Sequence, residues 1–591
     1  MWESMGKVQD TIGRIRARTT GNSAAPSAPP IALLVPGQQA PTDQSFPTAV
    51  EAVAQWLDAQ PAPSGIAGVH NLTRALQHSN RLENSPQQRL KIVQLFAERA
   101  HTAMPYLNSR YLGLDLPLRA EEQQAFNQSI QLLQELSYSY KIILLDVLQR
   151  RGQLTRKQRL PVIYQAMKYI GQSLLRSAQI YQNWPNRSWR DLNTLYILAE
   201  RDQILDAKIA DGSITADIQQ STLQKSSIST ARSIRQLHSQ LCAFSVCNTN
   251  QLTTTQIEQL YKTLAEHSPR YEISQTKPDC STGSIYSVAL NSANPPACHR
   301  FSLHTESGDL RYFSTEPLRD LDLLSNPLTP DSGNRMLNRE RQTLLWKDAA
   351  ARHTARSIRH RSINAETGFK EVFASVCLTG NKSGSPPLPA ANSPDVSDEC
   401  IDEIDWFAFN PTSNFGSEWT LLNQSNHGMG LRWSGQGNVK VAVGDLLAYC
   451  MQHRRSGQVR WLTGVIRWMQ LQNDNLTCGI EIIANNAEAV RLQKIMHQPA
   501  ETKNNSIHQL DGPRAEGLIL HGCQNSQNQK LLMVAGQTCK IGETLSLQDN
   551  HKLSTVKLIR KINYSSTVQC FALQEITVER ASHKLLQVKN S

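Results

Sequence analysis

This 591-residue sequence lacks several features that would assign it to a common class of protein. The 11 cysteines include no CxxC pair, so they have the spacing neither of a zinc site nor of a disulfide framework. No apolar run is long enough to cross a membrane, and the basic segment Met1–Arg18 lacks the apolar core of a signal peptide. We therefore expect a cytoplasmic protein that holds no metal.

The common catalytic motifs are also absent. The residues Gly380–Gly384 lack the spacing of a Walker A loop, and Gly435–Gly437 does not extend to GxGxxG. Neither a GxSxG nucleophile elbow nor an HExxH zinc motif occurs. Because no nucleophile–base pair and no cofactor fingerprint is recognisable, we expect a binding protein and not an enzyme, with no resident cofactor.

Positive charge is in excess but is spread along the chain. The formal net charge of +11 favours anionic partners. The densest basic stretch is Arg352–Arg361, and no long Lys/Arg tract exists. Nucleic-acid binding is thus suggested by charge alone, without a known reading motif. It is the weakest of the functions considered, and we expect no nucleic-acid partner.

The chain is longer than the ~250–300 residues at which a single core stops growing, so several domains are expected. Residues 1–46 are expected to form a disordered tail, because Thr19–Phe46 is rich in Pro, Ala, Ser and Gln. From 47 to 267, apolar residues recur at helical spacing, most clearly over Glu122–Leu148, and Ser188 is placed as a helix N-cap. Short polar connections between these segments predict a helical bundle.

After the helical segment, the pattern becomes mixed and then rich in β-strands. Residues 268–350 combine short strands with expected helices over Leu318–Leu324 and Arg339–Arg356, which indicates an α/β connector. Alternating apolar residues and turn signals then predict two blocks of antiparallel strands, 351–500 and 513–580. Neither block has helices long enough for βαβ units. The predicted fold is multidomain α+β, a helical bundle followed by two β-barrels.

Three motifs in the C-terminal third point to a binding site. Asn423–Gly428 reads NxSxxG, Gly464–Trp468 reads GVIRW, and Gly479–Ile482 reads GIEI. In order and spacing the three motifs resemble the core of the PilZ family, over about Trp419–Ile483. The resemblance implies that the first β-block is a PilZ-like antiparallel barrel and that its ligand is cyclic di-GMP.

PilZ domains also use an RxxxR motif just before their first strand. Arg352 and Arg356 have this spacing, and Arg356, Arg359 and Arg361 offer a second, overlapping register. The resemblance implies that these arginines lie on a pliable linker over 350–361 and wrap the ligand.

The expected barrel departs from the family pattern in one respect. Gly368–Val376 is expected to hold the first strand and a short following element, well ahead of the NxSxxG motif. Residues 380–418 then form an insertion within the barrel. A group of long PilZ proteins with a helical N-terminal part has a similar insertion, and this chain resembles that group.

The residue types suit the implied ligand. A guanidinium can bond a phosphate bidentately and stack on a guanine face, and guanine O6 and N7 accept hydrogen bonds from arginine. An asparagine amide and a serine hydroxyl can satisfy other edge atoms, and a glycine permits close approach. Asparagine in place of aspartate gives up a charge-assisted bond to guanine, which predicts weaker binding. The residues expected to bind cyclic di-GMP are Arg352, Arg356, Arg359, Arg361, Asn423, Ser425 and Gly428.

Each of these residues also has a purely structural interpretation. Asn423 and Ser425 are common in hairpin turns, and the arginines fit a solvated helix face that continues from Arg339 and Arg341. Trp433, Trp461 and Trp468 suit the core or rim of a barrel. A ligand-free PilZ-like scaffold or interaction protein therefore stays an alternative.

The second β-block, 513–580, contains no recognisable motif, and its strand pattern fits a degenerate PilZ-like barrel for packing or dimerisation. The hypothesis for the whole chain is a cyclic di-GMP effector. It would relay the second-messenger level to a protein partner, in motility or surface-attachment machinery as the family suggests. The sequence leaves open which partner is bound, which arginine register is used, how many ligands bind and whether the chain is a homodimer.

Overall fold

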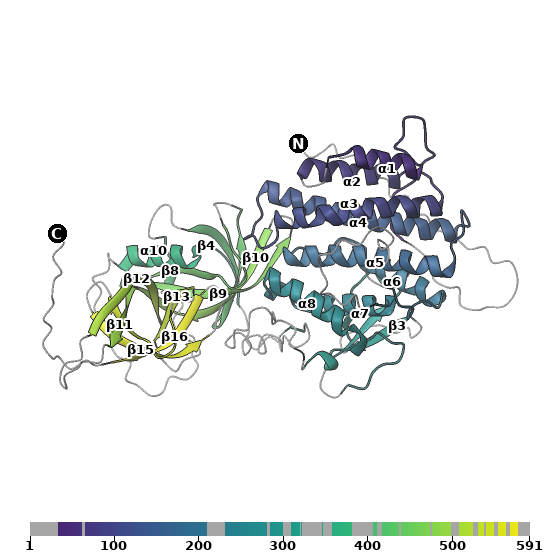
Figure 1. Ribbon diagram of the computed structural model, residues 1–591. Helices are drawn as coiled ribbons and strands as arrows, with labels where there is room; N and C mark the ends of the chain where they lie inside the picture. Colours follow the sequence, from purple (N-terminus) through teal and green to yellow (C-terminus); the bar gives the residue numbers. More distant parts are fainter. Residues whose placement is uncertain are drawn as a thin grey trace. The chain divides into compact units, whose positions relative to one another are not determined.

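The chain folds into two compact units in the computed structural model, and each is described by itself (Figure 1). The helical unit comprises Met1–Leu114 and Leu118–Ala351, and the barrel unit comprises Asp115–Pro117 and Arg352–Ser591. Within these bounds the structure describes residues 33–61, 65–209, 231–280, 284–299, 309–319, 321, 345–346, 357–380, 406–410, 416–435, 439–472, 475–497, 508–523, 530–536, 539–548, 553–562 and 568–576.

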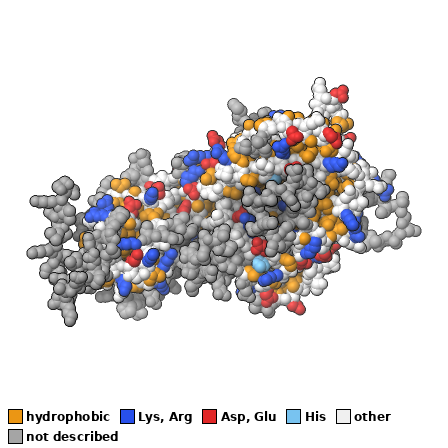
Figure 2. All heavy atoms as spheres, viewed as in Figure 1, with side chains coloured by type: hydrophobic (Ala, Val, Ile, Leu, Met, Phe, Trp, Pro, Cys, Tyr) orange, Lys and Arg blue, Asp and Glu red, His pale blue; other side chains and the backbone are white. Residues whose placement is uncertain are grey.

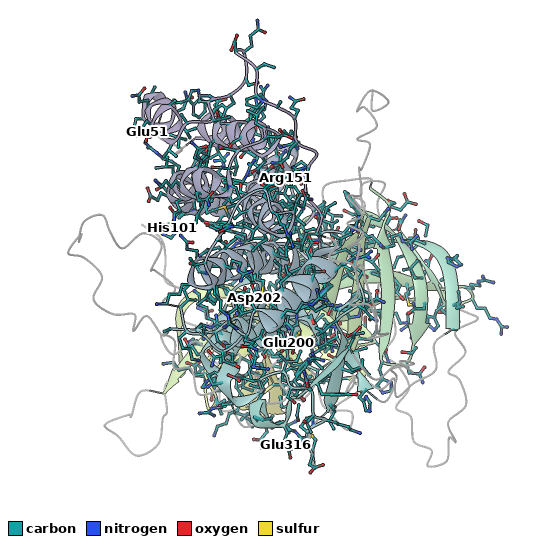
Figure 3. All side chains as sticks on the ribbon, turned by 90° about the vertical axis from the view of Figure 1, so that its right-hand side faces the viewer. Glu51, His101, Arg151, Glu200, Asp202 and Glu316 are labelled. Atoms are coloured by element: carbon teal, nitrogen blue, oxygen red, sulfur yellow. The ribbon has the colours of Figure 1, made fainter. Side chains whose placement is uncertain are left out.

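The helical unit is a stack of helices, which confirms the predicted helical bundle. A view turned by 90° shows the helices in successive layers (Figure 3). None of the helices that the structure describes has the length and apolar character needed to span a bilayer. The helices are α1 (Val50–Ala59), α2 (Ile66–Asn80), α3 (Pro86–Ser109), α4 (Ala120–Leu148), α5 (Arg156–Gln179), α6 (Ser188–Arg201), α7 (Ile234–Ser245) and α8 (Thr254–His267), with 3-10 turns η1 (Thr249–Gln251) and η2 (Ser268–Arg270).

Local sequence sets where several helices begin. Helices α5 and α7 start after Thr155 and Ser233, each in a reciprocal capping box with a glutamine three positions later. Helix α6 differs from the expectation, because Ser188 is its first residue and not its cap. The Ser188 hydroxyl instead donates to the carbonyl of Pro185 at 2.7 Å, and Arg187, with a left-handed φ of 66°, supplies the turn.

Helix α4 lies against α2, α3 and α5 and carries the longest apolar stripe. A buried ion pair also links this helix to α6, with 2.6 Å between Lys141 Nζ and Asp191 Oδ2. Burial lowers the pKa of Lys141, and the neighbouring Asp191 opposes that shift. The predicted stripe is buried at Phe126, Leu133, Leu136, Tyr140, Ile143 and Leu144.

Part of the expected N-terminal tail is ordered, which corrects the prediction for residues 33–46. The backbone N–H of Leu34 donates to Asp191 Oδ1 at 3.0 Å, so the segment completes the hydrogen bonding of a buried carboxylate. Further along, Gln39 forms a parallel bridge with Leu82, and Phe46 packs edge-on against Trp56. Composition missed this order because the segment is held by contacts distant in sequence. The rest of the expected tail, 1–32, lies outside the described residues.

The expected connector 268–350 belongs to the helical unit as far as it is described. It forms a three-stranded antiparallel sheet in the order β2-β1-β3. Of the helix expected over 339–356, only Leu345 and Trp346 are described, and Trp346 forms an antiparallel bridge with Cys247 instead. Most of the helix expected over 318–324 lies outside the described residues, as does most of the strand expected over 299–303. The observed elements are β1 (Ile285–Ala289), β2 (Ala297–Cys298), β3 (Leu310–Ser314) and η4 (Glu316–Leu318).

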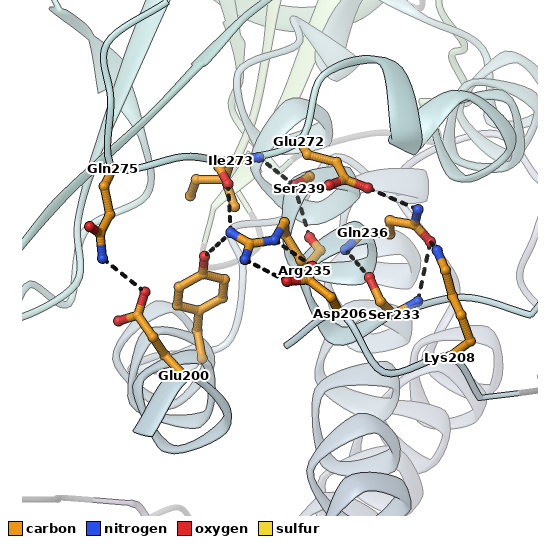
Figure 4. A network of polar contacts seen from close by, with 11 residues as sticks. Glu200, Asp206, Lys208, Ser233, Arg235, Gln236, Ser239, Glu272, Ile273 and Gln275 are labelled. Atoms are coloured by element: carbon orange, nitrogen blue, oxygen red, sulfur yellow. Dashed lines mark hydrogen bonds and ion pairs between the residues drawn. The ribbon is translucent and has the colours of Figure 1, made fainter. Parts of the chain in front are cut away.

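A polar network ties the chain that precedes this small sheet to α6 and α7 (Figure 4). Arg235 forms two bonds to the Asp206 carboxylate, at 2.7 and 2.9 Å, and donates to the Ile273 carbonyl at 3.2 Å. Arg311 of β3 pairs with Glu200 of α6 at 2.6 Å. Because the network joins segments far apart in sequence, the sheet is anchored to the bundle and does not act as a separate linker.

The barrel unit contains two closed barrels, as predicted. In the first, the strand order is β4-β6-β7-β10-β9-β8, and pairing of β4 with β8 closes the barrel. The short strand β5 pairs with the other end of β8, along the edge that also meets β4. Its strands are β4 (Ser357–Thr367), β5 (Trp406–Ala408), β6 (Ser417–Ser425), β7 (Gly428–Trp433), β8 (Leu446–His453), β9 (Val459–Gln472) and β10 (Asn475–Ala484).

The second barrel has the same topology as the first. Its circular order is β11-β12-β13-β16-β15-β14. With β5 set aside, the strands of each barrel, taken along the chain, follow the order first, second, third, sixth, fifth, fourth. The strands are β11 (Asn486–His497), β12 (His508–His521), β13 (Leu531–Ala535), β14 (Thr544–Gln548), β15 (Leu553–Ile562) and β16 (Val568–Glu575).

Two sequence expectations about these barrels were wrong. Gly368–Val376 is not the first strand, because Phe369–Gly380 forms helix α10 and the first strand is β4. Phe369, Val372 and Phe373 recur at helical spacing, which local periodicity predicts correctly. The expected end of the first barrel at residue 500 is also too late, since β11 pairs with β12 and β14 of the second barrel.

Helix α10 contributes to a core that both barrels share. Val372, Phe373 and Val376 pack together with Trp461 of the first barrel and Leu520 of the second. The Trp461 indole N–H also donates to the hydroxyl of Thr379 at 2.9 Å. The interior of the second barrel is a separate cluster. The shared core is therefore made by outward-facing residues of the two barrels, with the helix between them.

Truncation of the shared core should destabilise both barrels together. For Phe373→Ala we expect a loss of about 3–5 kcal/mol of unfolding free energy, because a buried aromatic leaves a cavity. Leu378→Ala on the same helix is the matched control, since Leu378 is 63% exposed and should change stability by about 0.5 kcal/mol or less. Hydrogen exchange of the full chain measures both barrels at once. Loss of protection in only one barrel would contradict a shared core.

His238 should make the helical unit sensitive to acid. It is fully buried, with its Nε2 3.2 Å from Asn193 Oδ1, and burial lowers its pKa to about 3. A histidine in the unfolded chain titrates near ~6.5, so the stabilisation is complete above that pH and is lost as the pH falls toward 3.

We expect His238→Gln to flatten the fall in unfolding free energy between pH 6.5 and 3, by up to about 1.4 kcal/mol per pH unit. Urea unfolding followed by circular dichroism at several pH values measures this. His101→Gln, on the exposed side of α3, is the control and should keep the wild-type dependence. An unchanged slope in His238→Gln would show that this histidine does not set the acid sensitivity.

Candidate functional site

The NxSxxG motif forms the hairpin between β6 and β7. Ser425 pairs with Gly428 across a two-residue turn, and the Ser425 hydroxyl donates to the Gly428 carbonyl at 3.2 Å. The backbone of Ile482 in β10 donates to the carbonyl of His427 at 3.0 Å. Hydrogen bonds thus hold the turn from both of its sides. The bond from Ser425 to Gly428 is the one expected if Ser425 only stabilises the hairpin turn.

Asn423 lies over a glycine of the neighbouring strand. A register shift between Leu421 and Asn423 places Asn423 opposite Gly430, on the outward side of β7, because Met429 and Leu431 are buried on the inner side. A Cβ atom at Gly430 would lie 3.0 Å from the Asn423 Oδ1 atom. The absence of a side chain at Gly430 therefore leaves room for the asparagine amide.

A second outward glycine lies beneath a tryptophan. Gly479 of β10 pairs with Trp468 of β9, and a Cβ atom at Gly479 would come within 1.8 Å of the Trp468 Nε1 atom. The register shifts here, so that Ile480 pairs with Ile466 and Arg467 is the extra residue of β9. Such a bulge re-aims side chains, and here both Arg467 and Trp468 are half-buried on the strand.

These residues define one surface, which we call the glycine face. Two half-buried side chains, Asn423 and Trp468, lie over its glycines, and an ion pair between Arg467 and Glu481 borders it. The glycine face consists of Gly428, Gly430 and Gly479 together with Asn423, Arg467, Trp468 and Glu481.

The corresponding surface of the second barrel is apolar. Its third and sixth strands carry Leu531, Met533, Cys570 and Ala572 on the side that packs into the core shared with α10 and the first barrel. Glycine and polar residues occupy the same side of the third and sixth strands in the first barrel. The two barrels therefore use equivalent surfaces differently, one for internal packing and the other as the polar glycine face.

The structure brings the start of β4 beside the NxSxxG motif. Ser357 pairs with Gln424 and Ile358 pairs with Asn423, followed by a register shift before Arg361. Arg361 is exposed. This corrects the expected linker over 350–361, because its last part is a strand and not a flexible connector.

The other predicted arginines are placed in part or not at all. Arg359 belongs to β4, but its side chain is not among those described. Arg352 and Arg356 lie outside the described residues, and Arg356 immediately precedes β4 in the sequence. Of the seven predicted site residues, the structure brings Asn423, Ser425 and Gly428 together with the beginning of the arginine-bearing strand.

The surface of the protein carries charges of both signs. On the face seen in Figure 2, Lys and Arg side chains are interspersed with acidic and apolar ones. Among the residues that the structure describes, no three His, Cys, Asp or Glu side chains are grouped so that they could hold a metal ion. The chemistry that the glycine face offers is hydrogen bonding by the Asn423 amide, one guanidinium, one carboxylate and one indole.

Sequence reasoning missed part of this arrangement. The motifs GVIRW and GIEI were identified, but Trp468 was assigned to the core or rim, and Arg467, Gly479 and Glu481 were given no role. The sequence signal for this surface was a glycine, Gly479, in one predicted strand and a tryptophan, Trp468, in the strand before it. Only the register, with its extra residue at Arg467, places them on one surface.

Two family models match the chain. One, described as "Cyclic-di-GMP receptor FimW, N-terminal domain", matches residues 51–279, which span the helices of the bundle. The other, described as "Cyclic-di-GMP receptor FimW, middle PilZ domain", matches residues 412–489, which contain β6 to β10. The second match confirms the predicted PilZ barrel, and it begins after β4, so the arginines lie outside it.

One curated relative is also similar to this chain. It is the cyclic-di-GMP receptor FimW of Pseudomonas aeruginosa, with 22% identity over 524 residues. The matched region covers 79% of this chain and 82% of the relative. No solved structure matches.

The fit between Gly479 and Trp468 predicts a specific cost for Gly479→Ala. The added methyl group would overlap the indole, so the ring must move and stability should fall by about 1–3 kcal/mol. In a Trp468→Ala background the same substitution should cost almost nothing. Gly37→Ala is the control, since no heavy atom lies within 4 Å of a Cβ there. Chemical denaturation of Gly479→Ala, Trp468→Ala, the double variant and Gly37→Ala measures these changes in stability. If Gly479→Ala costs as much with Trp468 present as without it, the contact is refuted.

Proposed function

Since this chain belongs to the long PilZ-domain proteins that carry a helical N-terminal region, we propose that it is a cyclic di-GMP-binding effector. The observation that carries the proposal is the pairing of β4 with β6, which brings an arginine-bearing strand to Asn423 and Ser425. The relative named as a cyclic-di-GMP receptor supports the identity of the ligand.

In the proposed site, charged side chains bind the phosphates and guanine faces of the ligand, and neutral groups bind the guanine edges. Arg361, with Arg352, Arg356 and Arg359 before it, holds the phosphates and stacks on guanine, because a guanidinium does both. The polar residues Asn423 and Ser425 bond guanine edges, and Gly428 allows close approach. Of these last three, Ser425 can rotate its hydroxyl from the Gly428 carbonyl toward a ligand.

The proposed output is a change in how a protein partner is contacted. Ligand bound by arginines at the start of β4 would fix the chain that leads into the first barrel from the helical unit. A switch of this kind requires a ligand that binds one arrangement better than the other. We propose a cytoplasmic binding protein, not an enzyme, with its partner in motility or surface-attachment machinery.

A ligand-free scaffold is the second candidate, and one observation favours it. Ser425 already has a hydrogen-bond partner within its own hairpin, as a purely structural residue would. The scaffold explains the second barrel equally well, since its equivalent surface serves packing alone. The two candidates differ in whether the chain binds the nucleotide at all.

Calorimetric titration of the full chain with cyclic di-GMP decides between them. We expect saturable binding, weakened about tenfold or more by Arg356→Ala, because a charge-assisted phosphate contact is lost. Asn423→Ala should weaken binding less, since it removes neutral hydrogen bonds. Arg432→Ala, at the far end of β7 from Gly428, is the control for net charge and should bind like the wild type. No heat up to high-micromolar ligand would reject the effector and leave the scaffold.

A further inference from the structure

The glycine face contains an ion pair that the proposed site does not use. The Nε atom of Arg467 in β9 donates to the Oε2 atom of Glu481 in β10. Both side chains are partly accessible, at 28% for Arg467 and 34% for Glu481. The pair is therefore open to solvent and to a ligand, unlike the buried pair of the helical unit.

A β-bulge in β9 places this ion pair on the surface. Arg467 is the extra residue in β9 between the Trp468–Gly479 and Ile466–Ile480 pairs. Without it, strict alternation would give Arg467 and Trp468 opposite sides of the strand. The bulge instead aims the guanidinium toward Glu481 while the indole covers Gly479.

The position of the pair relates it directly to the proposed ligand. Glu481 is the cross-strand partner of Gly428, the last residue of the NxSxxG motif. Cross-strand partners have Cα atoms about 4.5–5.5 Å apart. A carboxylate so close to a bound phosphodiester repels it, and a guanidinium at the same place attracts it. The net effect depends on whether Arg467 stays with Glu481 or turns to the ligand.

We propose that Arg467 is a further ligand-binding residue and that Glu481 is its counter-ion in the free protein, so that Glu481 and a ligand phosphate compete for one guanidinium. This inference rests on the proposed function. Glu481 holds the arginine beside the motif when the site is empty and lowers the affinity when it is filled. A half-exposed ion pair is weak, and a phosphate accepts from arginine at least as well as a carboxylate does, so the exchange is feasible.

The two residues are predicted to have opposite effects on affinity. In titrations of the full chain with cyclic di-GMP, Arg467→Gln should weaken binding about tenfold, since a charge-assisted contact is lost. Glu481→Gln should tighten binding about three- to tenfold, because it removes both the competitor and the repulsion. The double variant should bind like Arg467→Gln, since Glu481 acts mainly through the arginine.

Matched variants separate this effect from general charge and folding. Arg432→Gln removes an exposed arginine of the same barrel, and Glu543→Gln breaks the Lys494–Glu543 pair of the second barrel. Neither should change affinity more than about twofold. Arg467→Lys should restore part of the affinity if charge is what the ligand uses. The dependence of affinity on salt should become shallower in Arg467→Gln, which loss of a merely structural residue would not cause.

The outcomes distinguish the two levels of the proposal. If the unmodified chain does not bind, the proposed function fails and this inference fails with it. If the unmodified chain binds and a folded Arg467→Gln variant binds equally well, only this inference is overturned. Weaker binding by Glu481→Gln would also overturn it, because Glu481 would then be a direct acceptor for guanine. Thermal unfolding of each variant shows whether it is folded.

Discussion

The close packing of side chains from β6 and β9 over bare glycines of β7 and β10 is the constraint on which the proposed site depends. At Gly430 and Gly479 a methyl group would displace Asn423 or the Trp468 ring. Removing side chains from two adjacent strands lets polar groups from the flanking strands cover a sheet that would otherwise be apolar. The second barrel has the same topology with leucine, methionine, cysteine and alanine at the corresponding positions, and there the surface is buried in the shared core. The comparison within one chain shows that strand order alone does not make a site.

The shared core gives the second barrel a structural purpose. Its outward residues pack with α10 and with Trp461, Val465 and Ile483 on the outer side of β9 and β10. The shared core borders the glycine face, because Val465 is the cross-strand partner of Glu481. Strands β9 and β10 therefore have a fixed support next to the residues that are proposed to meet the ligand. A site supported by rigid elements holds its geometry better than one built on loops alone. The order of the chain, with α10 directly after β4, also connects that support to the strand that bears Arg361.

Sequence patterns predicted much of this fold. The helical stripe of α4 and the alternation in β6 to β10 and β12 to β16 follow from local periodicity, and the PilZ resemblance rested on motifs that the structure places together. The errors came where the family pattern was given more weight than periodicity, as at Phe369–Gly380, or where distant contacts decide, as at Leu34. For the site, β-bulges were the main reason why the sequence did not predict which side chains lie together. An extra residue at Arg467 reverses which side chains share a face, and no single-sequence pattern fixes that register.

The central claim is that the first barrel binds cyclic di-GMP where β4 meets the β6–β7 hairpin, while the second barrel does not bind it. Hydrogen–deuterium exchange of the full chain, with and without the nucleotide, tests it most directly because the second barrel is an internal control. The account predicts slower exchange on ligand addition over β4, β6 and β7, and unchanged exchange over β12 and β13. Unchanged exchange throughout the first barrel at saturating nucleotide, or protection confined to the second barrel, would contradict it.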